Sequence, residues 1–123
     1  MREAVLALSA VFFAGMGLCA LVAPAALVRP FGLVASSAVS RSEVRAVYGG
    51  FGLAVAGVLA WCATDDDAVR NGAATAVGVA MAGMAAGRVI SRLVDAPAAF
   101  YPIWFYCLVE AVAGGLLLGV VRA

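Results

Sequence analysis

Residues 87–95 place charges at the end of a long apolar run, where a membrane helix would be expected to meet lipid. Four polar residues of this segment recur at i, i+3, i+4 and i+7 and therefore share one face of a helix: Arg88, Ser91, Arg92 and Asp95. A charge at the centre of a membrane helix costs about 2.5–3.5 kcal/mol on insertion scales, so it usually faces protein or water. Because a guanidinium group binds a carboxylate or a phosphate through two parallel hydrogen bonds, this face predicts ion pairs or an anion-binding site.

The partners of this face are predicted from depth along the helices. With a rise of about 1.5 Å per residue, Arg88 lies about 10 Å deeper than Asp95, and Glu110 lies about 13 Å deeper than Tyr101. Since these depths are similar, we expect Arg88 and Glu110 to form a direct ion pair. The whole candidate binding site contains three basic, three acidic and three hydroxyl side chains: Arg45, Arg88, Arg92, Glu43, Asp95, Glu110, Tyr48, Ser91 and Tyr106.

Three roles remain open for these residues. In the first, the Arg88–Glu110 pair only fixes the register of two helices, while Arg92 extends to the lipid headgroups. In the second, the polar side chains form a pocket open to one leaflet, which binds or moves a small amphiphile, a small acid or an anionic lipid headgroup. The third role is catalysis. We do not expect an enzyme, because no nucleophile, metal-ligand set or phosphate-binding loop accompanies the carboxylates.

The composition is that of a membrane protein. Of the 123 residues, 66% are hydrophobic and 12% are charged, whereas soluble domains contain about 45–50% apolar residues. The net charge is +1, and no basic patch stands out, so nucleic acid is not an expected partner. The chain has no His, which excludes the usual imidazole base or ligand, and its three isolated cysteines behave as small hydrophobes. We therefore expect no metal and no cofactor.

Four apolar segments are long enough to cross a hydrocarbon core of about 30 Å, which needs about 20 residues. The predicted helices cover residues 3–23, 41–63, 68–94 and 100–121. A signal peptide is the alternative for the first segment, but its apolar region exceeds the usual length of about 7–15 residues. The predicted fold is one all-α domain over residues 1–123, a transmembrane four-helix bundle running up-down-up-down.

Location and orientation follow from the basic residues. Every one of them is Arg, and Ala, Val and Gly abound, which is typical of GC-rich bacterial genomes. We therefore expect a multi-pass protein of the bacterial cytoplasmic membrane. An even number of spans puts both termini on one side, and the positive-inside rule slightly favours the cytoplasm.

Helix starts and connections are predicted from local signals. Ser40 and Glu43 are spaced as the N-cap and N3 residues of a capping box, so the second helix is expected to begin there. Residues 27–34 are apolar but interrupted by Pro and Gly, which favours a short segment in the membrane interface. The acidic turn at residues 65–67 is expected to cap the third helix rather than bind calcium, because further oxygen ligands are missing.

Small residues recur every four positions, a pattern that lets membrane helices approach closely. Such ridges occur in the last three predicted helices: Gly49-Leu53-Gly57, Gly52-Ala56-Ala60, Ala74-Gly78-Ala82-Ala86, Gly83-x-x-x-Gly87 and Gly115-x-x-x-Gly119. They predict close packing within the chain, in a homo-oligomer, or against a larger membrane complex. A self-associating protein or an accessory and assembly subunit is therefore the alternative to a ligand-binding role.

Three blocks together resemble the signature of an uncharacterised bacterial family: Glu43-Val-Arg-Ala-Val-Tyr-Gly-Gly50, Gly87-Arg-Val-Ile-Ser-Arg-Leu-Val-Asp95 and Glu110. It is a domain-of-unknown-function family of small four-helix integral membrane proteins, and the resemblance spans nearly the whole chain. The resemblance implies a four-helix bundle without a known activity, so it assigns no catalytic residues. The family pattern has Asp-Gly after the third helix, where this chain has Asp95-Ala96-Pro97.

Overall fold

The computed structural model describes residues 1–96 and 100–122, and Pro97 lies outside them. These residues form helices and no strand. Four helical stretches are long and apolar enough to cross a membrane, as predicted: α1 (Arg2–Val22), Ala38–Cys62, α5 (Ala68–Val94) and α6 (Ile103–Arg122). The second stretch is a continuous series of three elements: α3 (Ala38–Val44), η2 (Arg45–Gly50) and α4 (Phe51–Cys62).

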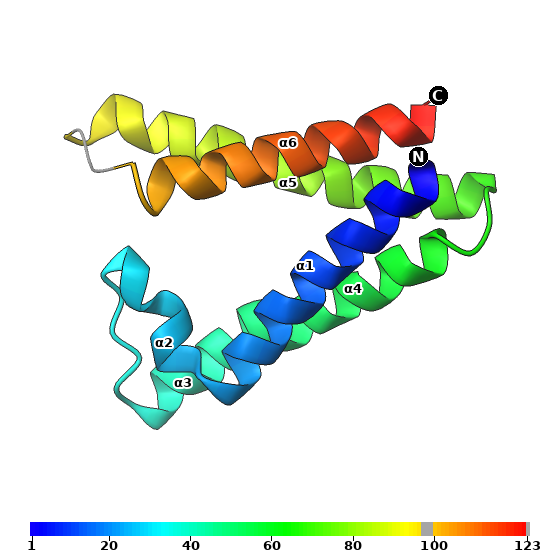
Figure 1. Ribbon diagram of the computed structural model, residues 1–123. Coiled ribbons are helices and arrows are strands. Elements are labelled where there is room, and N and C mark those ends of the chain that lie inside the picture. Colours follow the sequence, from blue (N-terminus) through cyan, green and yellow to red (C-terminus); the bar gives the residue numbers. More distant parts are fainter. Residues whose placement is uncertain (97–99, 123) are drawn as a thin grey trace.

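The long helices associate in two pairs. Figure 1 shows α1 lying along α4, and α5 lying along α6, and the closest packing is within these pairs. We call the part from α1 to α4 the first arm and the pair of α5 and α6 the second arm. The arms meet at the end that holds both chain termini and diverge toward the other end (Figure 1). The described chain is all-α, as predicted, and its two helix pairs together have the shape of a wedge (Figure 1).

Two separate apolar clusters account for this shape. The first lies where the arms meet and draws residues from all four spans: Leu6, Ala10, Phe13, Ala56, Leu59, Cys62, Ala74, Met81 and Leu117. The second belongs to the first arm alone: Ala20, Val28, Ala35 and Val44. Because the buried apolar contacts that join the arms are concentrated in the first cluster, that cluster holds the wedge together.

The predicted small-residue ridges differ in how they pack. A Cβ atom on Gly17 would lie 2.9 Å from the Gly49 carbonyl oxygen, and one on Gly114 would lie 3.0 Å from the Gly78 carbonyl oxygen. Each arm is thus closed by backbone-to-backbone contact that leaves no room for a side chain. Other glycines of the predicted ridges would have no neighbour within 4 Å of a Cβ atom: Gly57, Gly83, Gly87, Gly115 and Gly119.

The predicted capping box at Ser40 and Glu43 is wrong, because the second span begins one turn earlier. Ser37 is the N-cap: its hydroxyl accepts from the Ser40 N–H at 3.0 Å, and the Ser40 hydroxyl accepts from the Ser37 N–H at 3.0 Å. A serine hydroxyl can both accept and donate, so Ser40 takes the N3 role that usually belongs to Glu or Gln. Glu43 is left free of the cap.

The acidic turn caps the third predicted helix as expected. Asp67 is the N-cap of α5, and its carboxylate accepts from the Arg70 N–H at 2.9 Å. This backbone hydrogen bond, helped by the Arg70 guanidinium, lowers the pKa of the Asp67 carboxyl. The cap therefore stays ionised well into mildly acidic conditions, and its contribution to stability is lost only as the pH falls through that lowered pKa.

The connection between the first two spans folds into two short helices. They are α2 (Pro24–Val28) and η1 (Arg29–Phe31). Gly32 follows with a φ of 72°, a left-handed conformation that suits glycine, and it turns the chain back toward α3. Val28 is buried in the second cluster, whereas Leu33 and Val34 of the predicted interface segment remain exposed.

Cysteines introduced at the two chain ends, Glu3→Cys and Arg122→Cys, are expected to react with an impermeant thiol reagent from the same side of the membrane. Both ends lie at the same end of the molecule (Figure 1), and four spans return the chain to its starting side. Ser36→Cys, in the first connection, should react from the opposite side. The measurement is labelling of intact cells with exposed Cys19 replaced by Ala. Labelling of the two chain ends from opposite sides would contradict four spans.

Candidate functional site

The predicted ion pair between Arg88 and Glu110 is present. Arg88 on α5 donates from Nε to Glu110 Oε2 at 2.7 Å and from Nη2 to Glu110 Oε1 at 2.8 Å. The Glu110 side chain is 5% exposed and that of Arg88 is 25% exposed. Two parallel, charge-assisted hydrogen bonds fix both side chains in one geometry. The pair therefore locks the register of α5 against α6 near the open end of the wedge.

Two aromatic rings cover the guanidinium group of this pair. Arg88 Cζ lies 5.9 Å from the centroid of the Tyr106 ring, one turn before Glu110, and 5.8 Å from that of Phe31. The Phe31 and Tyr106 rings are themselves 5.2 Å apart. Phe31 belongs to η1 of the first arm. Its contacts with Arg88 and Tyr106 therefore connect the first arm to the second at the open end of the wedge. Cation–π contact over an aromatic face stabilises such a partly buried cation.

The other predicted site residues do not join the ion pair. Arg45 donates from Nε to the carbonyl oxygen of Leu21 at 3.1 Å and so binds the C-terminal end of α1. Three more predicted residues are exposed at the end of α5, with no ion pair or hydrogen bond from their side chains within the described residues: Ser91, Arg92 and Asp95. Glu43 and Tyr48 lie on the first arm. The nine candidates therefore do not form one cluster.

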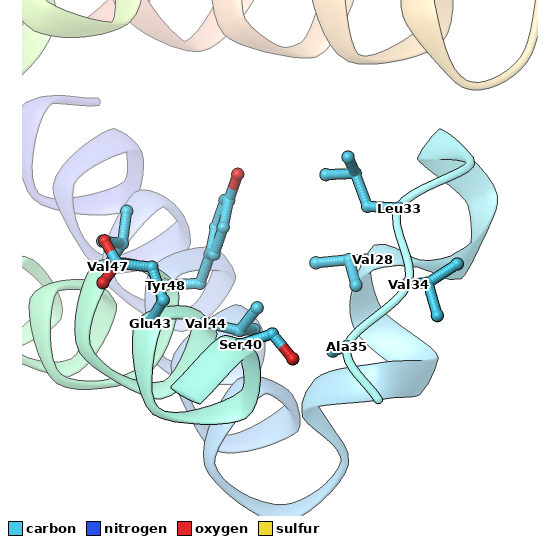
Figure 2. A pocket seen from close by; sticks show the side chains of 9 residues that line it. All are labelled: Val28, Leu33, Val34, Ala35, Ser40, Glu43, Val44, Val47 and Tyr48. Atoms are coloured by element: carbon cyan, nitrogen blue, oxygen red, sulfur yellow. The ribbon is translucent and has the colours of Figure 1, made fainter. Parts of the chain in front are cut away.

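Glu43 and Tyr48 line an open groove of about 360 Å³ in the first arm. Its walls come from α2, the segment after η1, α3 and η2: Val28, Leu33, Val34, Ala35, Ser40, Glu43, Val44, Val47 and Tyr48. Figure 2 shows the Tyr48 ring standing opposite Leu33 and Val28, with its hydroxyl pointing away from the first arm toward the second. The groove is apolar along its length, and its polar groups stand on the wall formed by α3 and η2.

A π-helical segment positions Tyr48. In η2, the Phe51 N–H reaches back five residues to the Ala46 carbonyl oxygen, so the turn holds one more residue than an α-turn does. Such bulges occur often at functional sites. In this segment Gly49 lies in backbone contact with Gly17, while Tyr48 is exposed on the groove side.

A second groove lies between α1 and α6 and has a volume of about 310 Å³. Apart from Ser9, its lining is wholly apolar: Val5, Leu8, Phe12, Met81, Val109, Val112, Ala113 and Leu116. A groove without charged or exposed polar groups can accommodate an acyl chain of the bilayer, but it offers nothing that would select a headgroup.

The end of the wedge where the arms meet has a polar network of its own. Arg2 donates from Nε and Nη2 to the Asn71 side-chain oxygen at 3.1 and 2.8 Å, and Asn71 donates to Asp66 at 2.6 Å. Arg70 pairs with Asp67 and lies 4.6 Å from the Trp61 ring centroid. These contacts tie the start of α1 to the start of α5. Most of the charged residues at this end of the wedge therefore have a structural role.

Neither Phe31 nor the groove was among the predicted site features. The segment Arg29-Pro30-Phe31-Gly32 shows no helical or strand periodicity that would indicate which way its aromatic ring points. A lone aromatic residue in a broken segment was therefore consistent with a membrane-interface position. Within the described residues, no group of three His, Cys, Asp or Glu side chains is arranged to hold a metal ion.

Comparison with protein families gives one finding. The family model described as a domain of unknown function, DUF4345, matches residues 1–121. Neither a curated protein nor a solved structure matches the chain. The matched region contains the first three spans, α6 except for Arg122, the Arg88–Glu110 pair and the groove beside Tyr48.

Proposed function

The chain belongs to the DUF4345 family, a domain of unknown function, as its signature blocks predicted, and we propose that it binds a membrane amphiphile in the groove beside Tyr48. It acts without catalysis, as a multi-pass protein of the bacterial cytoplasmic membrane. The four apolar helices support the membrane location. The proposed binding groove lies on the first arm, and Phe31 of the same arm contacts Arg88 of the second.

The observation that carries this proposal is the distribution of apolar and polar groups in the groove. Val28 and Val44 are buried at its base, while Leu33 and Val47 are exposed on its walls. Glu43 and Tyr48 supply polar groups on one side only. An amphiphile has the same division between chain and head. The volume of about 360 Å³ lies within the range of about 300–1,000 Å³ that is usual for ligand pockets.

The depth of the groove fits a ligand that enters from one leaflet. Its polar residues stand in the first turns of the second span, which begins at Ala38. At a rise of about 1.5 Å per residue, Tyr48 lies about 15 Å along the span from Ala38. A headgroup near Glu43 would therefore remain close to the membrane surface, with its chain directed inward past Tyr48.

A second candidate role is an accessory or self-associating subunit. It is favoured by the exposed glycine pairs Gly83/Gly87 and Gly115/Gly119, each of which has open space where a side chain would lie. Small residues at this spacing allow close approach of a helix from another chain. This role and amphiphile binding use different surfaces, so one experiment can separate them.

Val47→Trp is expected to displace the bound amphiphile, because the indole would occupy the groove next to Tyr48. The measurement is native mass spectrometry of the full chain in a mild maltoside detergent, counting retained lipid-like adducts. Val58→Trp is the matched control: Val58 lies on α4, is 39% exposed against 50% for Val47, and lines neither groove.

Loss of adducts in Val47→Trp but not in Val58→Trp would support the proposal. Equal retention in both variants would contradict it. If Gly83→Leu then converted a larger assembly to a monomer, the accessory or self-associating role would take its place.

A further inference from the structure

We propose that an anionic phospholipid binds between the two arms, with its headgroup at Arg88 and Arg92 and one acyl chain in the groove between α1 and α6. This site is separate from the groove beside Tyr48 and does not depend on the function proposed for that groove. It is supported by the register of α5 and α6, the free donors of the two arginines and the charge of the open end.

Helical register places the two arginines and the apolar groove on one surface. On α5, Met81 comes seven residues before Arg88 and Arg92 comes four residues after it, so the three residues share one face. On α6, Tyr106 covers Arg88, and Val109, one turn further on, lines the groove together with Met81. At a rise of about 1.5 Å per residue, Met81 lies about 16 Å deeper along α5 than Arg92. The groove therefore extends from the arginines in the direction that an acyl chain takes from its headgroup.

Arg88 has hydrogen-bond donors left for a ligand. Its bonds to Glu110 use Nε and Nη2, and its Nη1 atom has no hydrogen-bond partner among the described residues. In that part of the chain, the buried side-chain nitrogen without a partner belongs to Arg2, so Nη1 of Arg88 is accessible. A guanidinium group carries five N–H donors. Arg88 can therefore hold Glu110 with one edge and a phosphate oxygen with another.

Arg92 supplies a positive charge that no acid neutralises. It is exposed, and it lies one turn closer than Arg88 to the end of the span at Val94. The ion pairs of the described chain involve other residues, so Arg92 is not paired with Asp95 or with another acid. A free guanidinium near the level of the headgroups binds a phosphate through two parallel hydrogen bonds.

The open end of the wedge also carries an excess of positive charge. Apart from the Arg88–Glu110 pair, its charged residues are four arginines and two acids: Arg29, Arg41, Arg45, Arg92, Glu43 and Asp95. Such a surface attracts a lipid with a net negative charge more strongly than a zwitterionic one. The charge of this end therefore favours an anionic headgroup.

The test offers phosphatidylglycerol and phosphatidylcholine, with identical acyl chains and at equal concentrations, to the full chain in a mild maltoside detergent. Native mass spectrometry gives the adducts retained. We expect the phosphatidylglycerol adduct to exceed the phosphatidylcholine adduct about tenfold, the ratio that one charge-assisted hydrogen bond supports. Arg92→Gln should abolish this excess. Arg41→Gln is the matched control, since it makes the same change in charge at the same end of the wedge but on α3 of the first arm, and it should preserve the excess.

A second pair of variants tests the acyl-chain contact. Val112→Trp places an indole in the groove between α1 and α6 and should remove most of the excess phosphatidylglycerol adduct. Leu108→Trp is its control: Leu108 lies one turn earlier on α6, is 56% exposed against 58% for Val112, and lines neither groove. It should leave the excess intact.

Equal retention of the two lipids, or an excess that survives Arg92→Gln, would overturn the proposed lipid site. Loss of the excess in Val47→Trp but not in Val112→Trp would assign the lipid to the groove beside Tyr48 and would overturn it as well. The arginines would instead bind a free anion if Val112→Trp had no effect and inorganic phosphate were retained when lipid is withheld.

Discussion

Arg88→Ala is expected to destabilise the protein by about 3–5 kcal/mol, the usual loss when one partner of a buried ion pair is removed. The substitution leaves the Glu110 carboxylate without either of its two hydrogen bonds in a position that is 5% exposed. It also removes the cation beneath Phe31 and Tyr106, the contact through which the first arm reaches the second. Unfolding in mixed micelles, followed by circular dichroism, gives the free energy.

Two further variants show whether this loss belongs to the pair. Arg29→Ala changes an exposed arginine of η1 and should cost much less. Glu110→Ala added to Arg88→Ala should cost little more than Arg88→Ala alone, because the interaction is already absent. If the two single losses simply added, the residues would not be coupled, and the ion pair would not form in the folded membrane protein.

Gly17→Ala is expected to destabilise by about 1–3 kcal/mol, the usual range for an overpacked core position. The new Cβ atom would lie 2.9 Å from both the Gly49 carbonyl oxygen and the Leu53 backbone nitrogen. Neither atom can move away as a flexible side chain could, so α1 must shift relative to η2 and α4. Thermal unfolding of the purified full chain, compared with the unsubstituted protein, measures the effect.

Gly15→Ala provides the matched control on the same helix, two residues away. A Cβ atom there would have no neighbour within 4 Å, and alanine is favoured over glycine in a helix by up to about 1 kcal/mol. This variant should be neutral or slightly more stable. Because helix propensity favours alanine at both positions, equal destabilisation by the two substitutions would show that the contacts of Gly17 with Gly49 and Leu53 are not the cause of the loss.

The spans and the ion pair could be predicted because both depend on simple regularities. Long uncharged runs separated by charges and turn residues define the four helices, and the expected bounds of α5 are those observed. The partner of Arg88 followed from a constant rise per residue along two antiparallel neighbours. Depth along a helix can be counted from sequence, so the residue that would face Arg88 could be identified as Glu110.

The distance between neighbouring helices within the membrane plane could not be predicted in the same way. Arg45 was placed with the other arginines, yet it contacts Leu21 of the first arm, because the sequence does not show how far apart the two arms stand. The predicted start of the second span at Ser40 is one turn late. Ser37 offers the same hydroxyl one turn earlier, but the residue three positions after it is a serine, whereas Ser40 is followed by Glu43, the more usual N3 residue of a capping box. The π-turn at η2 has no distinctive residue pattern in the segment Arg45–Gly50.

The wedge also has a consequence for the order in which the protein is made. The first arm is encoded entirely by the N-terminal half of the chain, and its own cluster of Ala20, Val28, Ala35 and Val44 is complete before α5 has been synthesised. Chains fold from the N-terminus as they emerge, so this arm, groove included, can assemble as a helical hairpin by itself. Met81 and then Leu117 arrive later and seal the joint between the arms. Residues of α5 and α6, which follow the first arm in the chain, are therefore the ones that join the two helix pairs into one protein.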